Sequence, residues 1–397
     1  MRIPCLLCGR DLPAFHVFPR RTLFTKPLSA PQPEAVADMG IAWCDACRHI
    51  SSRLASPIPV EELHARTYRE LYRNFAPTGL SGLQLRYTDF VGEWLASWLS
   101  PGCRVLDIGC HDGYLLKRLA DHGHACEGIE PSPYADYAGE HYGLAVVQGF
   151  FTPDSYPPAS FDAVIVRHVT EHVADPVAFL RDAVRIVKPG GLLYVEVPNS
   201  QWSLEETYFP EFHADHISYF TMASLLTLLE RIGAGTVLHA EAFRAYVRFP
   251  FLAVLTRRSP AVAGRSRPDA GWLMTFGIDA AITRFTGTFG AYVARLRALR
   301  DGSRLAVWGA GSIGIQYAID AGWDAADVTY VDVNPANQGM VLPVTGHRIQ
   351  PPTVLRDAAD RLLIASGWEE DVRRQAAPFL RPGTPVHTFA DLVGGPQ

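Results

Sequence analysis

A stretch from Val105 to Gly113, with the sequence VLDIGCHDG, decides the fold of this 397-residue chain. An apolar run typical of a buried strand leads into a turn marked by Gly109 and Gly113, and an amphipathic segment follows from Tyr114 to Ala120. Glycine lets the backbone approach a ligand closely, and amide groups at the start of a helix suit a carboxylate. This strand–turn–helix unit therefore predicts a ligand site at the first turn of an α/β sheet.

The same alternation of apolar runs and amphipathic stretches continues after this turn. Further runs of strand character occur at residues 125–129, 161–166 and 191–196. Glu130 closes the first of these runs, in a position to hydrogen-bond ribose hydroxyls. The rhythm predicts a doubly wound α/β domain over residues 61–245, including the helical pattern that precedes the first strand.

A second α/β rhythm follows a connection and a long helical pattern. Its first strand leads into Gly309-x-Gly311-x-x-Gly314, and Asp332 ends the next strand. This spacing is the fingerprint of a dinucleotide-binding Rossmann fold. We therefore expect a C-terminal Rossmann-like domain over residues 246–397, and from these residues alone bound NAD stays open.

The N-terminal segment contains two CxxC pairs, Cys5 with Cys8 and Cys44 with Cys47. Two such pairs supply four thiolates, enough for a tetrahedral Zn²⁺ site with no open position. A small irregular module with few core residues needs a cross-link such as this bound metal ion to be stable. We expect structural zinc in a domain over residues 1–60; four unrelated buried cysteines are the alternative.

Composition limits the class of protein. The chain has 36 Lys and Arg and 41 Asp and Glu, with a net charge of -5, which gives no electrostatic footprint for nucleic acid. No apolar run reaches the roughly 18–20 residues of a membrane-spanning helix, and the first residues lack the pattern of a secretory signal. An odd number of cysteines, clustered in pairs, indicates a reducing compartment. We expect a cytoplasmic monomer or homodimer that acts on a small molecule and binds neither nucleic acid nor membrane.

The turn at Gly109 is G-x-x-x-G and resembles motif I of class I methyltransferases that depend on S-adenosylmethionine (SAM). Residues 161–173 and 188–191 resemble later strands of that superfamily, in the same order and spacing. The resemblance implies a class I methyltransferase fold with SAM as the cofactor. The residues expected around SAM are Asp107, Gly109, Cys110, Gly113, Tyr114, Glu130, Pro131 and His168.

Nearly the whole chain resembles the three-domain C-methyltransferases of deoxysugar biosynthesis. The cysteine pairs, the core and the C-terminal segments 307–314, 330–335 and 349–352 carry this resemblance. It implies a natural-product pathway in which the acceptor is a nucleotide-linked keto-deoxysugar, methylated on a carbon next to the ketone. It also implies that the C-terminal domain closes over the substrate and is not a redox site.

Carbon methylation needs a base, because the C–H beside a ketone must lose its proton before it attacks the methyl group. The candidate cluster is residues 212–220, FHADHISYF, after a strand that ends near Asn199. His216 and His172 match family histidines, while Asp215 and His213 stand where the family usually has Glu and Tyr. Tyr72 or Tyr68 matches a family tyrosine before the core. The expected catalytic residues are His216, His172, His213, Asp215 and Tyr72.

The departure at His213 leaves the identity of the base open, together with two other functions. A methyltransferase of this architecture can act on another acceptor, by O- or N-methylation or on a non-sugar metabolite. A non-catalytic protein that binds SAM or a dinucleotide is the second alternative.

Overall fold

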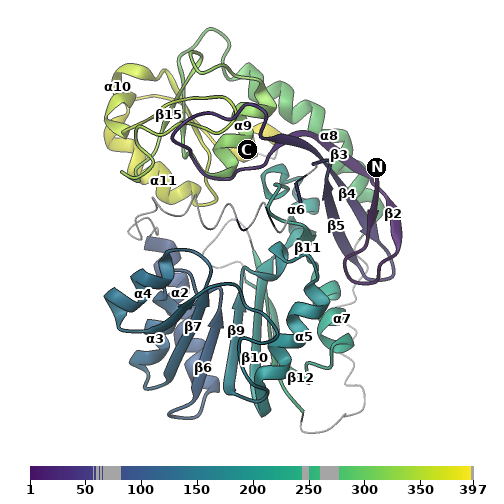
Figure 1. Ribbon diagram of the computed structural model, residues 1–397. Coiled ribbons are helices and arrows are strands. Elements are labelled where there is room, and N and C mark those ends of the chain that lie inside the picture. The colour runs from purple at the N-terminus through teal and green to yellow at the C-terminus, as the bar shows by residue number, and fades with distance from the viewer. Residues whose placement is uncertain are drawn as a thin grey trace.

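The computed structural model describes residues 1–56, 58–59, 62, 65, 82–243, 250–259 and 277–394. Figure 1 shows an N-terminal module of strands and a C-terminal α/β domain side by side, with a larger core domain below them. Within the described part of the chain, no helix is long and apolar enough to cross a membrane.

The core domain is built on a seven-stranded sheet in the order β12-β13-β10-β9-β6-β7-β8. Strands β10, β9, β6, β7 and β8 are parallel to one another, which confirms the predicted doubly wound α/β class. The strands are β6 (Arg104–Ile108), β7 (Ala125–Glu130), β8 (Ala145–Gln148), β9 (Phe161–Arg167), β10 (Val187–Pro198), β12 (Thr236–Phe243) and β13 (Phe251–Arg257). The helices around it are α2 (Gly82–Trp98), α3 (Tyr114–Asp121), α4 (Tyr134–Tyr142), α5 (Pro176–Ile186), α6 (Ser200–Glu205) and α7 (Met222–Arg231), with the short turns η4 (Thr170–His172) and η5 (Phe209–Glu211).

Strand β13 comes from a stretch that the sequence analysis assigned to a connection. It pairs antiparallel with both β10 and β12, so the core sheet continues past residue 245. The apolar run from Leu252 to Leu255 is fully buried, as expected for a strand that is covered on both faces.

The N-terminal module is more regular than its Pro- and Cys-rich composition predicts. A hairpin of β1 (Arg2–Pro4) and β2 (Asp11–Pro13) precedes a sheet in the order β11-β5-β4-β3. The sheet contains β3 (His16–Thr22), β4 (Val36–Cys44) and β5 (His49–Leu54). Its edge strand β11 (Ser218–Tyr219) belongs to the candidate catalytic segment, so the module reaches directly into the core domain.

The C-terminal domain has a five-stranded parallel sheet in the order β16-β15-β14-β17-β18. Its strands are β14 (Leu305–Trp308), β15 (Val328–Val331), β16 (Ile349–Gln350), β17 (Arg361–Ile364) and β18 (Val386–His387). Its helices are α8 (Ile278–Ala298), α9 (Ser312–Ala321), α10 (Leu355–Ala358), α11 (Glu369–Ala376) and α12 (Phe389–Val393), with η7 (Pro352–Val354) and η8 (Ala377–Phe379).

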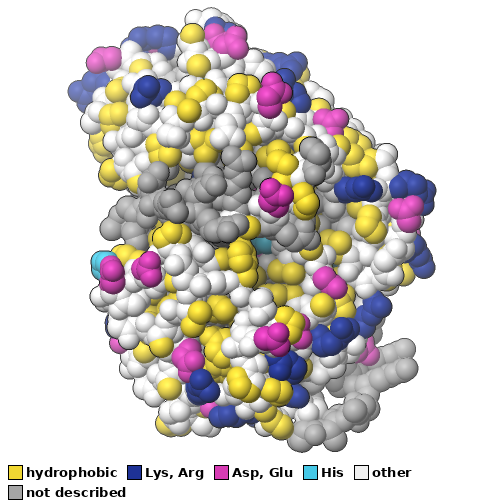
Figure 2. All heavy atoms as spheres, viewed as in Figure 1, with side chains coloured by type: hydrophobic (Ala, Val, Ile, Leu, Met, Phe, Trp, Pro, Cys, Tyr) yellow, Lys and Arg dark blue, Asp and Glu magenta, His cyan; other side chains and the backbone are white. Residues whose placement is uncertain are grey.

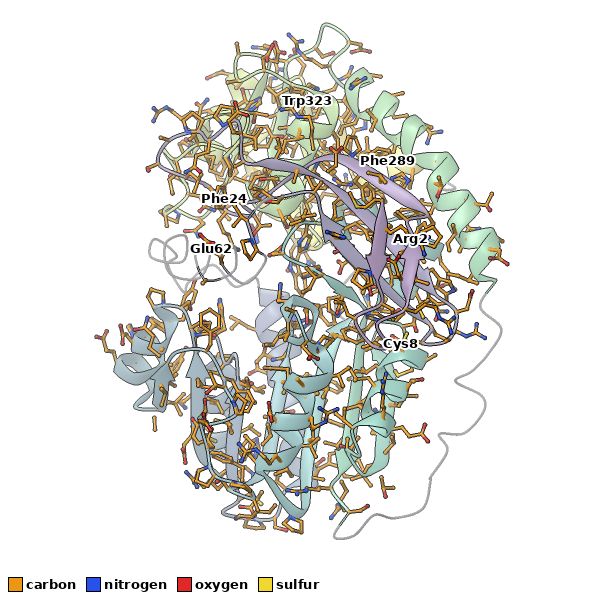
Figure 3. All side chains as sticks on the ribbon, turned by 45° about the vertical axis from the view of Figure 1, so that its right-hand side comes forward. Arg2, Cys8, Phe24, Glu62, Phe289 and Trp323 are labelled. Atoms are coloured by element: carbon orange, nitrogen blue, oxygen red, sulfur yellow. The ribbon has the colours of Figure 1, made fainter. Side chains whose placement is uncertain are left out.

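An aromatic core joins the N-terminal module to helix α8. Figure 3 labels Phe289 on α8, beside the N-terminal strands, and Trp323 within the C-terminal domain. The Phe289 ring lies 5.4 Å from that of Phe18 on β3, and Phe212 stacks on Phe18 at 5.7 Å. Aromatic pairs at such separations stabilise a packed interface beyond the area that they bury.

One buried ion pair crosses the same interface. Arg21 of β3 and Asp320 of α9 have side chains with 0% and 2% exposure, and their charged atoms lie 3.3 Å apart. Gln316 and Tyr292 also donate hydrogen bonds to Asp320, at 2.8 and 3.2 Å. Removal of one partner therefore leaves a buried charge without its counter-charge.

We predict that Arg21→Met lowers the free energy of unfolding by about 3–5 kcal/mol, because Asp320 stays buried. Chemical denaturation followed by tryptophan fluorescence measures this change. The matched control is Arg2→Ala, which breaks the exposed Arg2–Asp11 pair and should cost at most about 1 kcal/mol. Equal losses in the two variants would contradict this role of the buried pair.

Candidate functional site

A cavity of about 890 Å³ lies at the carboxyl ends of β6, β7 and β9. Figure 2 shows a hollow between the upper and lower parts of the molecule, with hydrophobic side chains around it. Ligands of doubly wound sheets bind at this edge of the sheet. The predicted residues that line the cavity are Asp107, Gly109, Cys110, Tyr114, Glu130, Pro131, His168 and His172.

The first turn has the backbone conformation that its glycines suggested. Gly109 and Gly113 have φ angles of +75° and +78°, a backbone conformation that residues other than glycine rarely adopt. A Cβ on Gly109 would lie 2.4 Å from Cγ2 of Val169, beside the cavity. A Cβ on Gly113 would meet Ala138 at 2.7 Å, and Gly113 is not among the cavity residues. Gly109 therefore shapes the cavity wall, whereas Gly113 permits close packing of α3 against α4.

Two of the acids that line the cavity, Asp107 and Glu130, lie in different environments. The Glu130 carboxylate accepts backbone hydrogen bonds from His111 at 3.0 Å and Ser132 at 2.9 Å, which fix its position. Asp107 has a buried oxygen, Oδ1, without a hydrogen-bond partner in the structure. Burial raises the pKa of Asp107 to about 7. An unpartnered buried oxygen beside a cavity fits a ligand that donates hydrogen bonds or carries positive charge.

Several cavity residues were not predicted from the sequence. Phe150 and Phe151 follow β8, and Phe251 begins β13. Trp368 comes from the C-terminal domain, just before α11, and also lines the cavity. The position of Phe150 after a core strand offered a usable signal, but nothing local in the sequence links Trp368 to this site.

Glu196 of β10 contacts two cavity residues, Arg167 and His168, and accepts several hydrogen bonds. Its carboxylate lies 2.8 Å from Nε2 of His168 and 3.1 Å from Arg167, and it accepts hydrogen bonds from Tyr87 and Tyr194. Burial alone raises the pKa of Glu196, but Arg167 and His168 outweigh burial and hold it below its usual range. This network fixes the side chain of His168 at the cavity wall.

His168 connects that network to Glu171. Its Nδ1 lies 3.5 Å from Oε1 of Glu171. Burial opposes a positive charge on His168, but its contacts with Glu171 and Glu196 raise its pKa to about 9. His168 therefore carries a positive charge at neutral pH, held between two carboxylates.

The predicted catalytic histidines lie together beside His172, which lines the cavity. The ring of His216 is 4.7 Å from that of His172, and the ring of His213 is 3.9 Å from that of His216. His172 Nδ1 lies 2.8 Å from the carbonyl oxygen of Asp215, and the Asp215 carboxylate contacts His213 Nδ1. His213, Asp215 and His216 are not among the cavity-lining residues, and the side chains of His213 and Asp215 are 14% and 21% exposed.

The surroundings shift the pKa values of His213 and His216 in opposite directions. Burial lowers the pKa of His213, but the Asp215 carboxylate outweighs burial and raises it above its usual value. Burial, followed by the neighbouring His213, holds the pKa of His216 well below its usual value. Glu211 lies 3.2 Å from Nδ1 of His216 and was missed in the sequence, and burial raises its pKa to about 7.

The N-terminal module positions this candidate catalytic segment. Ser52 of β5 donates through its side chain to the carbonyl of His216 and through its amide to that of Ile217, both at 3.0 Å. Ser218 and Tyr219 then pair with β5 as strand β11. Thr25, after β3, donates a hydrogen bond to the Asp215 carboxylate at 3.4 Å. Tyr72 and Tyr68 lie outside the described residues.

The four predicted cysteines lie together at a separate site. The four sulfur atoms of Cys5, Cys8, Cys44 and Cys47 all lie within 4.8 Å of one another, and those of Cys8 and Cys44 are 3.8 Å apart. Figure 3 places Cys8 at the end of the N-terminal module nearest the core domain. Four sulfurs about 2.3 Å from a tetrahedral Zn²⁺ are separated by about 3.8 Å, so the donor set fits that ion.

The comparisons with known proteins concern the core domain. Residues 66–239 match a family model described as "Methyltransferase domain". A ubiquinone biosynthesis O-methyltransferase of Parvibaculum lavamentivorans is 32% identical over 142 residues, which cover 34% of this chain and 56% of that protein. Its counterpart in Xanthomonas campestris pv. campestris is 34% identical over 106 residues, which cover 25% of this chain and 44% of that protein. The chain spans about half the length of the curated relatives that it matches.

Two solved structures show the extent of structural likeness. A SAM-dependent methyltransferase from Mesorhizobium loti has a TM-score of 0.36 and 19% identity, and the match covers 43% of this chain and 100% of that one. The 1,6-didemethyltoxoflavin-N1-methyltransferase of Burkholderia thailandensis has a TM-score of 0.40 and 15% identity, and the match covers 55% and 99%.

The sheet order, the first turn and the match of the family model agree on the same part of the chain. Over residues 66–239, this chain contains a SAM-dependent methyltransferase domain of the class I fold.

Proposed function

We propose that the protein methylates a small acceptor with SAM after His213 has removed a proton from that acceptor. The observation that carries this proposal is the contact of the His213 imidazole with the Asp215 carboxylate, in a cluster that adjoins the cofactor cavity. A carboxylate on Nδ1 fixes the tautomer whose Nε2 accepts a proton, which is the arrangement of a general base. His172 lines the cavity, and the ring of His216 lies 4.7 Å from that of His172 and 3.9 Å from that of the proposed base.

The cavity residues suit SAM. Glu130, at the end of β7, is placed for the ribose hydroxyls, and the unpartnered oxygen of Asp107 suits the ammonium group. The aromatic rings of Phe150 and Phe251 supply apolar contact. When bound, SAM supplies an electrophilic methyl group on a positively charged sulfur.

The favoured acceptor is a nucleotide-linked keto-deoxysugar, methylated on a carbon beside the ketone. His213 takes that C–H proton, the carbon bonds to the methyl group, and the methyl–sulfur bond breaks to leave neutral S-adenosylhomocysteine. The resemblance of all three parts of the chain to sugar C-methyltransferases supports this acceptor, as does a cavity that Trp368 of the C-terminal domain helps to line.

O-methylation of a hydroxylated small molecule is the second candidate. The curated relatives bear the name ubiquinone biosynthesis O-methyltransferase, and a hydroxyl acceptor needs the same base. Exchange with deuterated water, without SAM, separates the two candidates. A carbon acceptor gains deuterium at the reacting C–H in the presence of the enzyme, whereas the carbon-bound hydrogens of a hydroxyl acceptor do not exchange.

We predict that His213→Ala lowers turnover by roughly 10²–10⁴-fold while SAM affinity is kept, because a general base contributes about that much. Asp215→Asn should lower turnover in the same direction. A coupled assay of S-adenosylhomocysteine release measures turnover, and calorimetry measures affinity. The exposed His141→Ala is the control and should match the wild type. Wild-type turnover in His213→Ala would remove His213 from the reaction.

We predict that Gly109→Ala weakens SAM binding roughly tenfold to hundredfold, because displacement of the turn misplaces the cofactor. The new Cβ would lie 2.4 Å from Val169 beside the cavity. Gly102→Ala is a matched control, since Gly102 has a φ angle of +76° and open space around it. If calorimetry gives equal SAM affinities for both variants, the first turn does not hold SAM.

The cysteine cluster supports a structural zinc ion. Burial raises the pKa of the Cys5 thiol to about 11, so this sulfur becomes a thiolate at neutral pH only beside a cation. The ion would be held by Cys5, Cys8, Cys44 and Cys47 and would stabilise the module that supports β11.

We predict that a mercurial thiol reagent releases about one zinc ion per chain, because four thiolates bind one ion. A metallochromic dye measures the release. Cys8→Ser should abolish it, whereas Cys103→Ser, outside the cluster, should leave it unchanged. Zinc-free protein that was purified without a chelator would contradict the assignment.

A further inference from the structure

We propose that Glu171, His172 and His216 bind a divalent transition-metal ion that holds an oxygen atom of the methyl acceptor. This inference rests on the proposed function and deepens it, because it assigns a role to His172 and His216. The group is separate from the four cysteines and lies in the core domain.

Two histidines and one glutamate lie close enough together to bind one metal ion. One ligand atom from each of Glu171, His172 and His216 lies within 4.8 Å of the others. Two imidazoles and one carboxylate suit zinc, iron, cobalt or nickel ions better than magnesium or calcium. Three protein ligands also leave coordination positions open, which is typical of catalytic metal sites.

The burial of Glu171 is an independent observation that points to a cation. Glu171 is 1% exposed, and its Oε2 atom has no hydrogen-bond partner in the structure. Its other oxygen, Oε1, lies 3.5 Å from Nδ1 of His168, and within the described part of the chain no Lys or Arg side chain pairs with Glu171. A buried carboxylate oxygen without a partner is costly, and a bound cation removes that cost.

His172 has an orienting oxygen at Nδ1. The carbonyl oxygen of Asp215 lies 2.8 Å from Nδ1 of His172. Metal-binding histidines usually donate one N–H to a carbonyl or carboxylate and bind the ion through the other nitrogen. The carbonyl oxygen therefore favours Nε2 of His172 as its ligand atom. The buried Nδ1 of His216 lies 3.2 Å from the Glu211 carboxylate but forms no hydrogen bond with it.

The place of the site defines its role in the reaction. His172 lines the cofactor cavity, so the ion would lie at the cavity wall next to the acceptor. A Lewis acid there stabilises negative charge on an acceptor oxygen while His213 removes the proton. The acceptor class is therefore a molecule with an oxygen next to the methylated atom, such as a ketone that forms an enolate.

The test uses Co²⁺ as the probe on the full chain, with its thiolate site filled by zinc. We expect one Co²⁺ per chain, with visible d–d bands and without the thiolate-to-cobalt charge-transfer bands of a cysteine site. Glu171→Gln, which has almost the same shape, and His172→Ala should each abolish this binding. The exposed His122→Ala is the control and should bind Co²⁺ normally.

The outcomes separate this inference from the proposed function. No Co²⁺ binding by the wild type, unchanged binding by Glu171→Gln, or thiolate charge transfer would overturn the metal site. If one of these results is found while SAM affinity and His213-dependent turnover are retained, the proposed function stands without the metal. Loss of Co²⁺ binding in Glu171→Gln with retained SAM affinity and a native circular dichroism spectrum supports the site.

Discussion

The pairing of β11 with β5 is the contact on which the candidate active site depends. Only two residues, Ser218 and Tyr219, form this strand, yet they join the N-terminal module to the segment that carries His213, Asp215 and His216. Ser52 extends the contact by binding the backbone carbonyls of His216 and Ile217. A loop held by a rigid sheet keeps its side chains in one arrangement, which catalysis and metal binding both require.

The cysteine cluster and the buried ion pair explain how a small module can hold this segment in place. Cys5, Cys44 and Cys47 pack in the same hydrophobic core as Phe220 and helix α7, so the cluster anchors the module on the core domain. Arg21 and Asp320 anchor its other side on the C-terminal domain. The module is thus held on one side by the core domain and on the other by the C-terminal domain.

The sequence predicted those parts of the structure whose causes are local. The strand and turn from Val105 to Gly113 and the four cysteines are readable because spacing along the chain fixes their geometry. Strand β13 was missed because Ser-, Pro- and Arg-rich neighbours outweighed its apolar run. Glu211 and Trp368 could not be found, because only the tertiary fold brings them to His216 and to the cavity.

The C-terminal fingerprint shows how a motif can have a local explanation. Asp332 accepts hydrogen bonds from the amides of Ala310 and Asn334, and a Cβ on Gly314 would lie 2.0 Å from the Gly309 carbonyl oxygen. Internal packing of the turn therefore accounts for these residues. At the core domain, by contrast, the first turn adjoins a cavity and Asp107, whose buried Oδ1 has no hydrogen-bond partner.

Hydrogen exchange of the catalytic segment tests the central claim most directly. Amide exchange of residues 213–220 is measured by mass spectrometry before and after the proposed zinc ion is removed from the cysteine cluster. If the N-terminal module holds β11 in place, exchange in this segment accelerates when the metal is removed, while exchange of β6 and β9 stays slow. Unchanged protection of residues 213–220 in the metal-free protein would show that the core domain orders the site by itself and would contradict this account.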